Sequence, residues 1–332
     1  MAGEKGVLVV GELSDGQLAS ITRELLTAGR GLADALGEPL VAFLAGAEVP
    51  EEAARSAIAS GADRVRVAEH PLIGEPVNPY AFRLALEQAV RQVDPTVVLL
   101  GRTALGRDVG PCLAFGLGVG MAQDCVELEM QEGRLVAVRP VYGGTAMARV
   151  ALSQRPFIAT VRPKVYEPEE PDPSRTGEVE RLEVALSEEQ IPVKVKERVA
   201  EEVTGPRLET ARVVVGGGRG LGGPEPFRML EELARLLGGA VGASRAVCDA
   251  GWLPHSYQIG LTGKTITADL YIAVGISGAS QHMAGVSTVK TIVAINKDPD
   301  APIFKEARFG VVGDWQKVLP AFMDEVRKLV SE

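Results

Sequence analysis

The sequence predicts an α/β protein with two domains, an N-terminal layered α/β domain and a C-terminal doubly wound domain built on a parallel sheet. Short β-type runs alternate with helical stretches in both halves of the chain, which is typical of strands covered by helices. The 332 residues are about twice the length of a typical domain. Hydrophobic residues make up 46% of the chain, which is enough for a sizeable core in each half.

In the first half we expect strands and helices to alternate. Residues 78–93 form an amphipathic pattern, and the run that follows them is apolar throughout, as in a fully buried parallel strand. The expected strands are 7–10, 40–45, 64–67 and 96–101, and the expected helices are 17–36, 51–60 and 78–93. From Leu128 the pattern changes to strands joined without long helices, at 136–139 and 159–162.

A composition shift separates the two halves. Residues 163–206 are rich in proline and carry 12 acidic against 6 basic side chains, which is typical of an extended, solvated connector with room for one strand. We therefore expect an N-terminal domain over residues 1–163, a connector over 164–206 and a second domain over 207–332.

The second domain has the doubly wound pattern. We expect strands at 212–215, 271–274, 291–295 and 309–312, and helices at 226–237 and 315–330. Polar residues follow the strands, and ligands bind such sheets in the crevice outside the carboxyl ends of the strands. The first half lacks a comparable phosphate loop, so we expect it to serve as a scaffold and partner surface.

Charge and cysteine usage exclude several classes of protein. The net charge is −9, and residues 1–206 hold 21 basic and 31 acidic side chains against 14 and 13 in residues 207–332. An acidic front half argues against general nucleic-acid binding. The three scattered cysteines match no metal-binding pattern and suit a reducing compartment, so we expect a cytoplasmic protein. No apolar run is long enough to span a bilayer.

The most informative stretch is residues 272–282. An apolar run stops abruptly at Gly275 and gives way to small residues, then to Gln281 and His282. A strand, a tight turn and a helix start present backbone N–H groups that bind anions such as pyrophosphate. The side chains of Gln281 and His282 would then hydrogen-bond a heteroaromatic ring, so the stretch suggests a phosphate-bearing cofactor. A strand, a turn and a helix with a polar cap are an equally good explanation of the turn alone.

A glycine-rich turn supplies a second candidate. Gly218-x-Gly220-x-x-Gly223 after a strand fits the dinucleotide-binding expression, but the acidic residue expected about 20 positions further on is replaced by Ser244-Arg245. Nicotinamide binding is therefore the weaker alternative, whereas Arg219 within the glycines would pair with phosphate oxygens. The segment 258–265 ends like a P-loop but has Gln258 where that motif needs glycine.

The remaining polar residues have ordinary explanations beside the functional ones. Asn296 fits turn chemistry and Asp314 fits a helix cap, while His70 and His255 are expected at the surface. The sequence shows neither a serine-elbow triad nor an acid/base pair set apart by its spacing. We infer that a bound cofactor performs the chemistry.

Residues 270–285 resemble the signature of electron transfer flavoprotein alpha subunits. Blocks at 217–220, 243–245, 258–264, 290–298 and 301–304 resemble that family in the same order, as do 106–109, 124–125, 139–144 and 159–163. The resemblance covers most of the chain. It implies a nucleotide-binding-like N-terminal domain and a C-terminal domain that binds FAD.

The resemblance also implies that the protein is an electron carrier with bound FAD rather than an enzyme, and it implies partners and roles for single residues. The family member is one half of a heterodimer whose beta subunit holds AMP, or a second FAD in electron-bifurcating relatives that use NADH. It takes electrons from acyl-CoA and related dehydrogenases, in fatty acid beta-oxidation, and passes them to a quinone oxidoreductase. Carried over, Arg245 would lie against the flavin ring, Thr262 would reach N5 and His282 would face the pyrimidine-side carbonyl. The phosphate, ribityl and adenosine parts would fall to Arg219, Ser244, Asn296 and Asp314.

The full set of expected cofactor-binding residues is Arg219, Ser244, Arg245, Gln258, Ile259, Gly260, Leu261, Thr262, Ser277, Gly278, Ala279, Ser280, Gln281, His282, Asn296, Asp314 and Trp315. Leu261 and Ser280 depart from the family, which often has Gln and Ile there, and backbone contacts from both turns should survive. Two rivals remain from the residues alone: an NAD-dependent dehydrogenase, and a nucleotide-sensing module of the same fold without a redox role.

Overall fold

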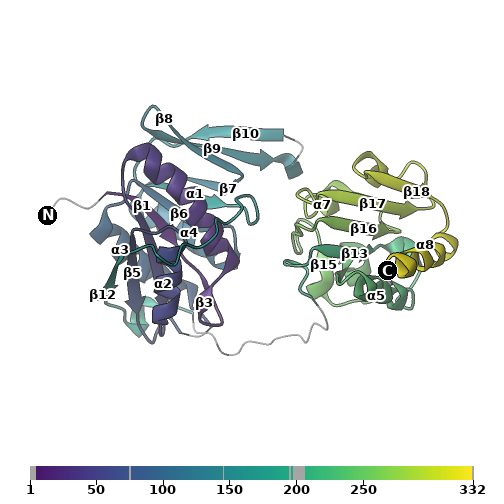
Figure 1. Cartoon of the computed structure of the whole chain (residues 1–332), viewed down its shortest axis with the longest axis horizontal. Helices are drawn as coiled ribbons and strands as arrows, with labels where there is room; N and C mark the ends of the chain where they lie inside the picture. The colour runs from purple at the N-terminus through teal and green to yellow at the C-terminus, as the bar shows by residue number, and fades with distance from the viewer. Residues whose placement is uncertain (1–4, 75, 145, 194–195, 197–205, 331–332) are drawn as a thin grey trace. The chain divides into compact units, whose positions relative to one another are not determined.

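The chain folds as two units, each organised around its own parallel sheet (Figure 1). The computed structural model describes residues 5–74, 76–144, 146–193, 196 and 206–330. The first unit comprises Met1–Val141 with Ala146–Arg198, and the second comprises Tyr142–Thr145 with Val199–Glu332. The mixed α/β architecture with two parallel sheets confirms the predicted fold class.

The first unit contains a seven-stranded parallel sheet in the order β12-β5-β4-β1-β6-β11-β7. Its strands are β1 (Val7–Val10), β4 (Leu40–Gly46), β5 (Arg64–Glu69), β6 (Val97–Gly101), β7 (Met121–Cys125), β11 (Phe157–Val161) and β12 (Glu178–Leu182). The helices are α1 (Ser20–Leu36), α2 (Glu51–Ala59), α3 (Pro79–Val93) and α4 (Ala104–Leu117).

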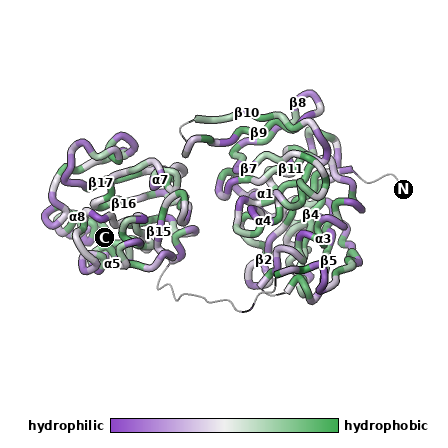
Figure 2. The backbone as a smooth tube through the Cα atoms, turned by 180° about the vertical axis from the view of Figure 1, so that it is seen from behind, coloured by the Kyte–Doolittle hydropathy of each residue, from purple (hydrophilic) through white to green (hydrophobic). Residues whose placement is uncertain are grey.

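Helices cover both faces of this sheet because its central strands are apolar on both sides. Every residue of β1, β4 and β6 is buried, and Figure 2 shows the hydrophobic colour concentrated along the inner strands. One core cluster joins the sheet to α1 and α2, through Leu25 and Ala57 among others. A second joins the other face to α3 and α4, through Phe82 and Leu113. This is the layered arrangement that fully apolar strand runs predict.

Two elements of the first unit differ from expectation. The helix predicted from residue 17 begins at Ser20, because Gln17 and Leu18 (β3) pair instead with Leu13–Ser14 (β2) in a small hairpin. Asp15 and Gly16 make its turn with positive φ angles of 52° and 74°. Helix α4 was not expected, since its glycines and Pro111 lower helix propensity. Packing overrides that propensity. Only a glycine at position 106 lets the helix approach the end of β6 this closely, because a Cβ there would overlap the carbonyl oxygen of Gly101.

The change of pattern after Leu128 corresponds to a separate antiparallel sheet. Its order is β10-β9-β8, with β8 (Glu127–Gln131), β9 (Arg134–Val141) and β10 (Ala146–Ala151). Leu135 and Ala137 of β9 join the core cluster of α1. The sheet therefore covers part of the same face as α1 and α2.

The expected connector contributes to the first sheet. Strand β12 pairs in parallel with β5, from Glu178 opposite Arg64 to Leu182 opposite Ala68. Ion pairs Arg64–Glu178 and Arg66–Glu180 join the two strands. An acidic strand is suited to a sheet edge beside the arginines of β5, so residues 164–198 group with the first unit rather than forming a free linker. The last part of the predicted connector, 197–205, lies outside the described residues.

The second unit contains a six-stranded parallel sheet in the order β15-β14-β13-β16-β17-β18. Its strands are β13 (Val213–Gly217), β14 (Ala240–Ser244), β15 (Gln258–Ile259), β16 (Leu270–Val274), β17 (Thr291–Asn296) and β18 (Phe309–Val312). Numbered along this unit, the order is 3-2-1-4-5-6, which is the doubly wound order. Strands are added on one side of β13 up to β15 and on its other side from β16 onward, so a crevice is expected between β13 and β16.

Most of the described helices of this unit pack on one face of its sheet. The helices are α5 (Phe227–Leu236), α6 (Arg245–Asp249), α7 (Ser280–Met283) and α8 (Trp315–Val330). Leu230 of α5 and Leu319 of α8 share one core cluster with β13 and β16. Tyr271 and Val286 belong to the cluster on the opposite face. In the part of the chain that the structure describes, every helix is too short or too polar to cross a membrane.

A carboxylate occupies the switch point of the first sheet. Glu12 follows β1 and accepts a hydrogen bond from Thr103 after β6, with 2.6 Å between Oγ1 and Oε1. Burial raises the pKa of Glu12 to about 7, and the Thr103 bond opposes that shift only in part. Once ionised, a carboxylate at this position would repel a phosphate.

We expect Glu12→Gln to stabilise the protein at alkaline pH. The unfolded chain loses the Glu12 proton above about pH 4.5 and the folded chain only above about pH 7, so stability falls as pH rises through that window. The full shift corresponds to roughly 3 kcal/mol, and relaxation of the site should leave a gain of about 1–2 kcal/mol at pH 8. Urea unfolding at pH 4.5 and pH 8 measures it, with the exposed Glu52→Gln as control. An equal effect of Glu12→Gln at both pH values would contradict the account.

Candidate functional site

A cavity of about 680 Å³ opens at the carboxyl ends of the strands of the second unit. Arg219 and Gly220 follow β13, Ser244 ends β14, Gly275 follows β16, and Asn296 ends β17. The cavity therefore lies at the switch point that the strand order defines, where doubly wound folds bind their ligands.

The structure brings most of the expected site residues together there. Those that line the cavity are Arg219, Ser244, Arg245, Gln258, Ile259, Gly260, Leu261, Thr262, Ser277, Ala279, Gln281, His282 and Asn296. Four do not line it: Gly278, Ser280, Asp314 and Trp315. Asp314 Oδ1 instead accepts a hydrogen bond from the Gln316 N–H at 3.0 Å, the helix cap that the sequence offered as the alternative. Trp315 packs against the core cluster beneath α8.

The glycine-rich turn makes room for backbone rather than for a dinucleotide. A Cβ at Gly218 would overlap the Gly275 carbonyl oxygen, and one at Gly220 would lie 2.8 Å from it. The N–H of Gly220 donates to that carbonyl at 3.0 Å. Two loops thus cross in contact at the switch point. Helix α5 begins only at Phe227, so its N-terminus does not follow the turn directly as the dinucleotide motif requires.

The helix that follows the turn, α7, is short. It spans four residues, so little macrodipole can develop at its start, and the expected helix-terminus contribution to anion binding is small. What remains is the turn itself, in which Gly278 has φ 81° and packs its Cα against the backbone of Ile303. Among the described residues, no backbone hydrogen bond uses the N–H groups of Ser280 and Gln281, which are therefore available as donors.

Gln258 and Thr262 form a hydrogen-bonded wall on one side of the cavity. Gln258 is 4% exposed, and its Nε2 donates to Thr262 Oγ1 at 2.9 Å. Its Oε1 lies 3.0 Å from Nδ1 of His255, so the ring would donate there. Because Thr262 Oγ1 already accepts one bond, its hydroxyl proton points elsewhere and is free for a ligand acceptor. His255 is exposed as expected, yet it supports the site through Gln258.

The loop that carries Thr262 is fastened to α7. The N–H of Leu261 donates to the Gln281 carbonyl at 2.7 Å, so that N–H is not available to a ligand. The expectation of a surviving backbone contact therefore does not hold for the Leu261 N–H. Gly260 has φ 140°, and a Cβ there would lie 2.9 Å from the Gln281 carbonyl oxygen. This close approach fixes Thr262 and His282 on neighbouring parts of the wall.

His282 is buried and neutral. It is 7% exposed, and its Nε2 lies 2.9 Å from the hydroxyl of Tyr271. Burial lowers the pKa of the imidazole to about 4, and the backbone of Ile259 opposes that shift only in part. Nδ1 is buried without a hydrogen-bond partner among the described residues. An unpaired buried ring nitrogen in a cavity wall is costly, and a ligand atom would relieve that cost.

Two arginines line the cavity, beside two aspartates. Arg245 Nε lies 3.2 Å from Asp249 Oδ2, which holds the guanidinium at the cavity wall. Arg219 stands on the turn after β13, and no ion pair among the described residues uses its side chain. The side-chain amide of Asn296 already makes two hydrogen bonds within the protein. Nδ2 donates to the Ile276 carbonyl at 2.9 Å, and Oδ1 accepts from the Asp298 N–H at 3.0 Å. The arrangement suits a ligand with phosphates and a polar ring.

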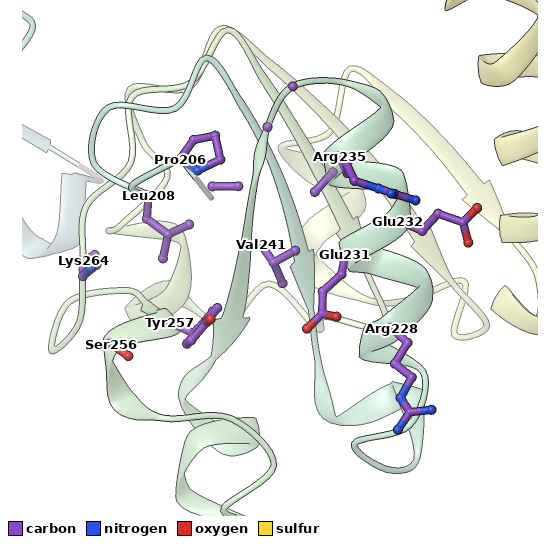
Figure 3. Close-up of a pocket in the computed structure, with 14 residues that line it drawn as sticks. Pro206, Leu208, Arg228, Glu231, Glu232, Arg235, Val241, Ser256, Tyr257 and Lys264 are labelled. Atoms are coloured by element: carbon purple, nitrogen blue, oxygen red, sulfur yellow. The ribbon is translucent and has the colours of Figure 1, made fainter. Parts of the chain in front are cut away.

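A second cavity of about 750 Å³ lies elsewhere on the second unit (Figure 3). Its wall combines Glu231 and Glu232 of α5 with Val241 of β14, Tyr257 and Lys264 (Figure 3). It reaches the amino end of β14, away from the carboxyl ends of the strands where doubly wound folds bind their ligands, and three cations, Arg228, Arg235 and Lys264, line it beside the two carboxylates. We therefore place the cofactor site in the smaller cavity.

Seven lining residues were not among the expected cofactor-binding residues, although several lie in stretches that the sequence singled out: Gly220, Ala246, Asp249, Gly275, Ile276, Asp298 and Ala301. Most are small or apolar and carry no chemical signal of their own. The sequence did contain a signal for Asp249. It follows Arg245 by four residues, and oppositely charged side chains at that spacing meet on the face of a helix.

A 3-2-1-4-5-6 parallel sheet with polar groups gathered at its carboxyl ends defines a doubly wound nucleotide-binding domain. Residues 7–187 match the family described as "Electron transfer flavoprotein domain", and residues 207–287 match "Electron transfer flavoprotein FAD-binding domain". The chain therefore belongs to the family of electron transfer flavoprotein alpha subunits, as the resemblance predicted.

Curated relatives agree over nearly the full length. The chain is 42% identical over 327 residues to the electron transfer flavoprotein subunit alpha of Thermoanaerobacterium thermosaccharolyticum, and 41% identical over 325 residues to that of Bacillus subtilis, with 98% of each chain covered in both cases. It is 40% identical over 334 residues to Protein FixB of Clostridium saccharobutylicum, covering 100% of this chain and 99% of that protein. Membership identifies an electron carrier rather than a catalytic enzyme, with a flavin-binding second unit.

Proposed function

We propose that this chain is the FAD-carrying subunit of a cytoplasmic heterodimer that shuttles electrons. Its partner would be a beta subunit holding AMP, its donors acyl-CoA and related dehydrogenases of fatty acid beta-oxidation, and its acceptor a quinone oxidoreductase. The relatives named as alpha subunits support the beta-subunit partner. Three free thiols, of Cys112, Cys125 and Cys248, support a reducing compartment.

The observation that carries the FAD proposal is the wall formed by Thr262 and His282. Thr262 has a hydroxyl proton to donate, and His282 has a buried Nδ1 without a partner. FAD, when bound, supplies the electron-accepting ring. Thr262 would donate to its N5 and His282 to its pyrimidine-side carbonyl, while Arg245 would lie against the ring.

The remaining lining residues fit the rest of such a cofactor. Arg219 and Ser244 would hold the phosphate and ribityl parts, and Asn296 the adenosine. Each of these side chains can donate hydrogen bonds, and the phosphate and hydroxyl oxygens of the cofactor can accept them. Backbone N–H groups of Ser280 and Gln281 would add uncharged donors. Asp314 and Trp315 are left out of this proposal, since they serve helix α8.

Reduction by a donor enzyme tests the proposed role. We expect the chain, purified with its beta subunit, to accept electrons from an acyl-CoA dehydrogenase supplied with its acyl-CoA, followed as bleaching of the flavin absorbance. Absence of reduction by any acyl-CoA dehydrogenase would remove those donors from the proposal. Direct reduction of the flavin by NADH would favour the electron-bifurcating alternative, in which the beta subunit carries a second FAD.

A further inference from the structure

Tyr271 and His282 form a buried pair directly behind the wall of the cofactor cavity. Tyr271 is 0% exposed, and its hydroxyl lies 2.9 Å from Nε2 of His282, whose ring lines the cavity. Among the described residues no other hydrogen bond reaches the hydroxyl, and Nδ1 of the ring has none, although the backbone of Ile259 lies close enough to the imidazole to oppose the lowering of its pKa. Tyr271 therefore lies in the core, away from water, and His282 lies between Tyr271 and the cavity.

The fold holds the Tyr271 hydroxyl in place. Gly216 of β13 lies against it, and a Cβ at Gly216 would overlap the hydroxyl oxygen. The tyrosine and histidine rings lie 6.0 Å apart between centroids, tilted by 34°. Glycine at position 216 thus makes the space in which the phenol meets the imidazole.

Proton accounting assigns the direction of this hydrogen bond. A phenol carries one proton, and a neutral imidazole has one donor and one acceptor nitrogen. If Tyr271 donates to Nε2, both the phenol proton and the Nε2 lone pair are satisfied, and the ring proton stands on Nδ1. The reverse arrangement buries the phenol proton without an acceptor, which disfavours it by roughly tenfold or more.

The ring is neutral at physiological pH, because burial lowers the pKa of His282 well below its ordinary value. A neutral imidazole is a donor at only one nitrogen, and the partner of the other nitrogen decides which. The identity of residue 271 thus controls whether His282 can donate from Nδ1.

We propose that Tyr271 is a positioning residue that holds His282 as the Nδ1–H tautomer and so presents a hydrogen-bond donor to the flavin ring. This inference rests on the proposed FAD site. Reduction places negative charge on the ring, and a fixed donor stabilises that charge. Tyr271 would thereby raise the flavin potential without touching the cofactor.

Histidine nitrogen shifts test the tautomer independently of flavin. The chain has three histidines, so the ¹⁵N-histidine spectrum of the purified protein is simple to assign with a His282→Ala sample. We expect a protonated Nδ1 and an unprotonated, hydrogen-bonded Nε2 in the parent protein, and a mixture of tautomers in Tyr271→Phe. A protonated Nε2 in the parent protein would overturn the proposal, whether or not FAD binds.

The flavin potential tests the consequence. We expect Tyr271→Phe to keep its FAD and to lower the one-electron equilibrium constant for reduction by threefold to tenfold, about 30 to 60 mV. Gly216→Ala, which displaces the phenol and keeps both side chains, should shift it in the same direction. Tyr257→Phe, at the other cavity, is the matched control and should leave the potential unchanged. An unchanged potential in flavin-loaded Tyr271→Phe would overturn the proposal, whereas a chain that binds no flavin would instead refute the proposed function.

Discussion

Gly218→Ala is expected to destabilise the second unit by about 1–3 kcal/mol and to lower its FAD content. The new methyl group would overlap the Gly275 carbonyl oxygen, and its other neighbours are also backbone atoms, of Gly275 and Ile276. Backbone cannot yield by a rotamer change, so the two crossing loops must separate. Their separation would pull apart the floor of the cofactor cavity.

Urea unfolding followed by tryptophan fluorescence measures this effect. Both tryptophans, Trp252 and Trp315, belong to the second unit, so the signal reports on that unit alone. Gly223→Ala is the matched control within the same glycine motif, because its Cβ would meet only the flexible end of Glu225. We expect it to stay within about 0.5 kcal/mol of the parent protein. Equal losses in the two variants would favour the dinucleotide motif, in which the third glycine packs the helix.

His282→Ala is expected to lower the potential of the bound flavin by about 65–130 mV while FAD remains bound. A hydrogen bond to a charged group contributes about 1.5–3 kcal/mol, and a tenfold change in a one-electron equilibrium corresponds to about 59 mV. The alanine removes the donor that would stabilise negative charge on the reduced ring. The other contacts of the cofactor, from Arg219, Ser244 and Thr262, stay in place.

Spectroscopic titration against dyes of known potential measures the shift. The direction matters as much as the size, since loss of a donor makes reduction harder. His70→Ala, which changes a histidine of the first unit, should leave the potential unchanged. A rise in potential in His282→Ala, or no change with FAD fully bound, would show that His282 is not the donor.

The strands were predictable because they are apolar throughout. Residues 96–101 and 271–274 carry no competing signal, and the structure has strands at both places. Helix α4 and strand β12 could not be predicted, because tertiary contacts determine them. The glycines of α4 allow it to pack against the end of β6. The arginines of β5 form ion pairs with the acidic strand β12. Local sequence does not contain those neighbours.

The cavity was largely predictable for a related reason. Loops that follow parallel strands meet at one edge, so Ser244, Thr262 and His282 were expected together and line one cavity. The contribution of Tyr271 was hidden, because it stands in the middle of an apolar strand and reads as core. The crossing of Gly218 with Gly275 was hidden as well, since a glycine pattern alone does not say whether it faces a phosphate or another backbone.

The FAD content of the purified heterodimer tests the central claim most directly. The chain is co-expressed with its beta subunit, and the visible spectrum is recorded before and during stepwise reduction. The account predicts a yellow protein with about one FAD in this chain, which takes up electrons one at a time. A colourless protein that also fails to take up added FAD would contradict it, and would favour a nucleotide-binding domain without a redox role.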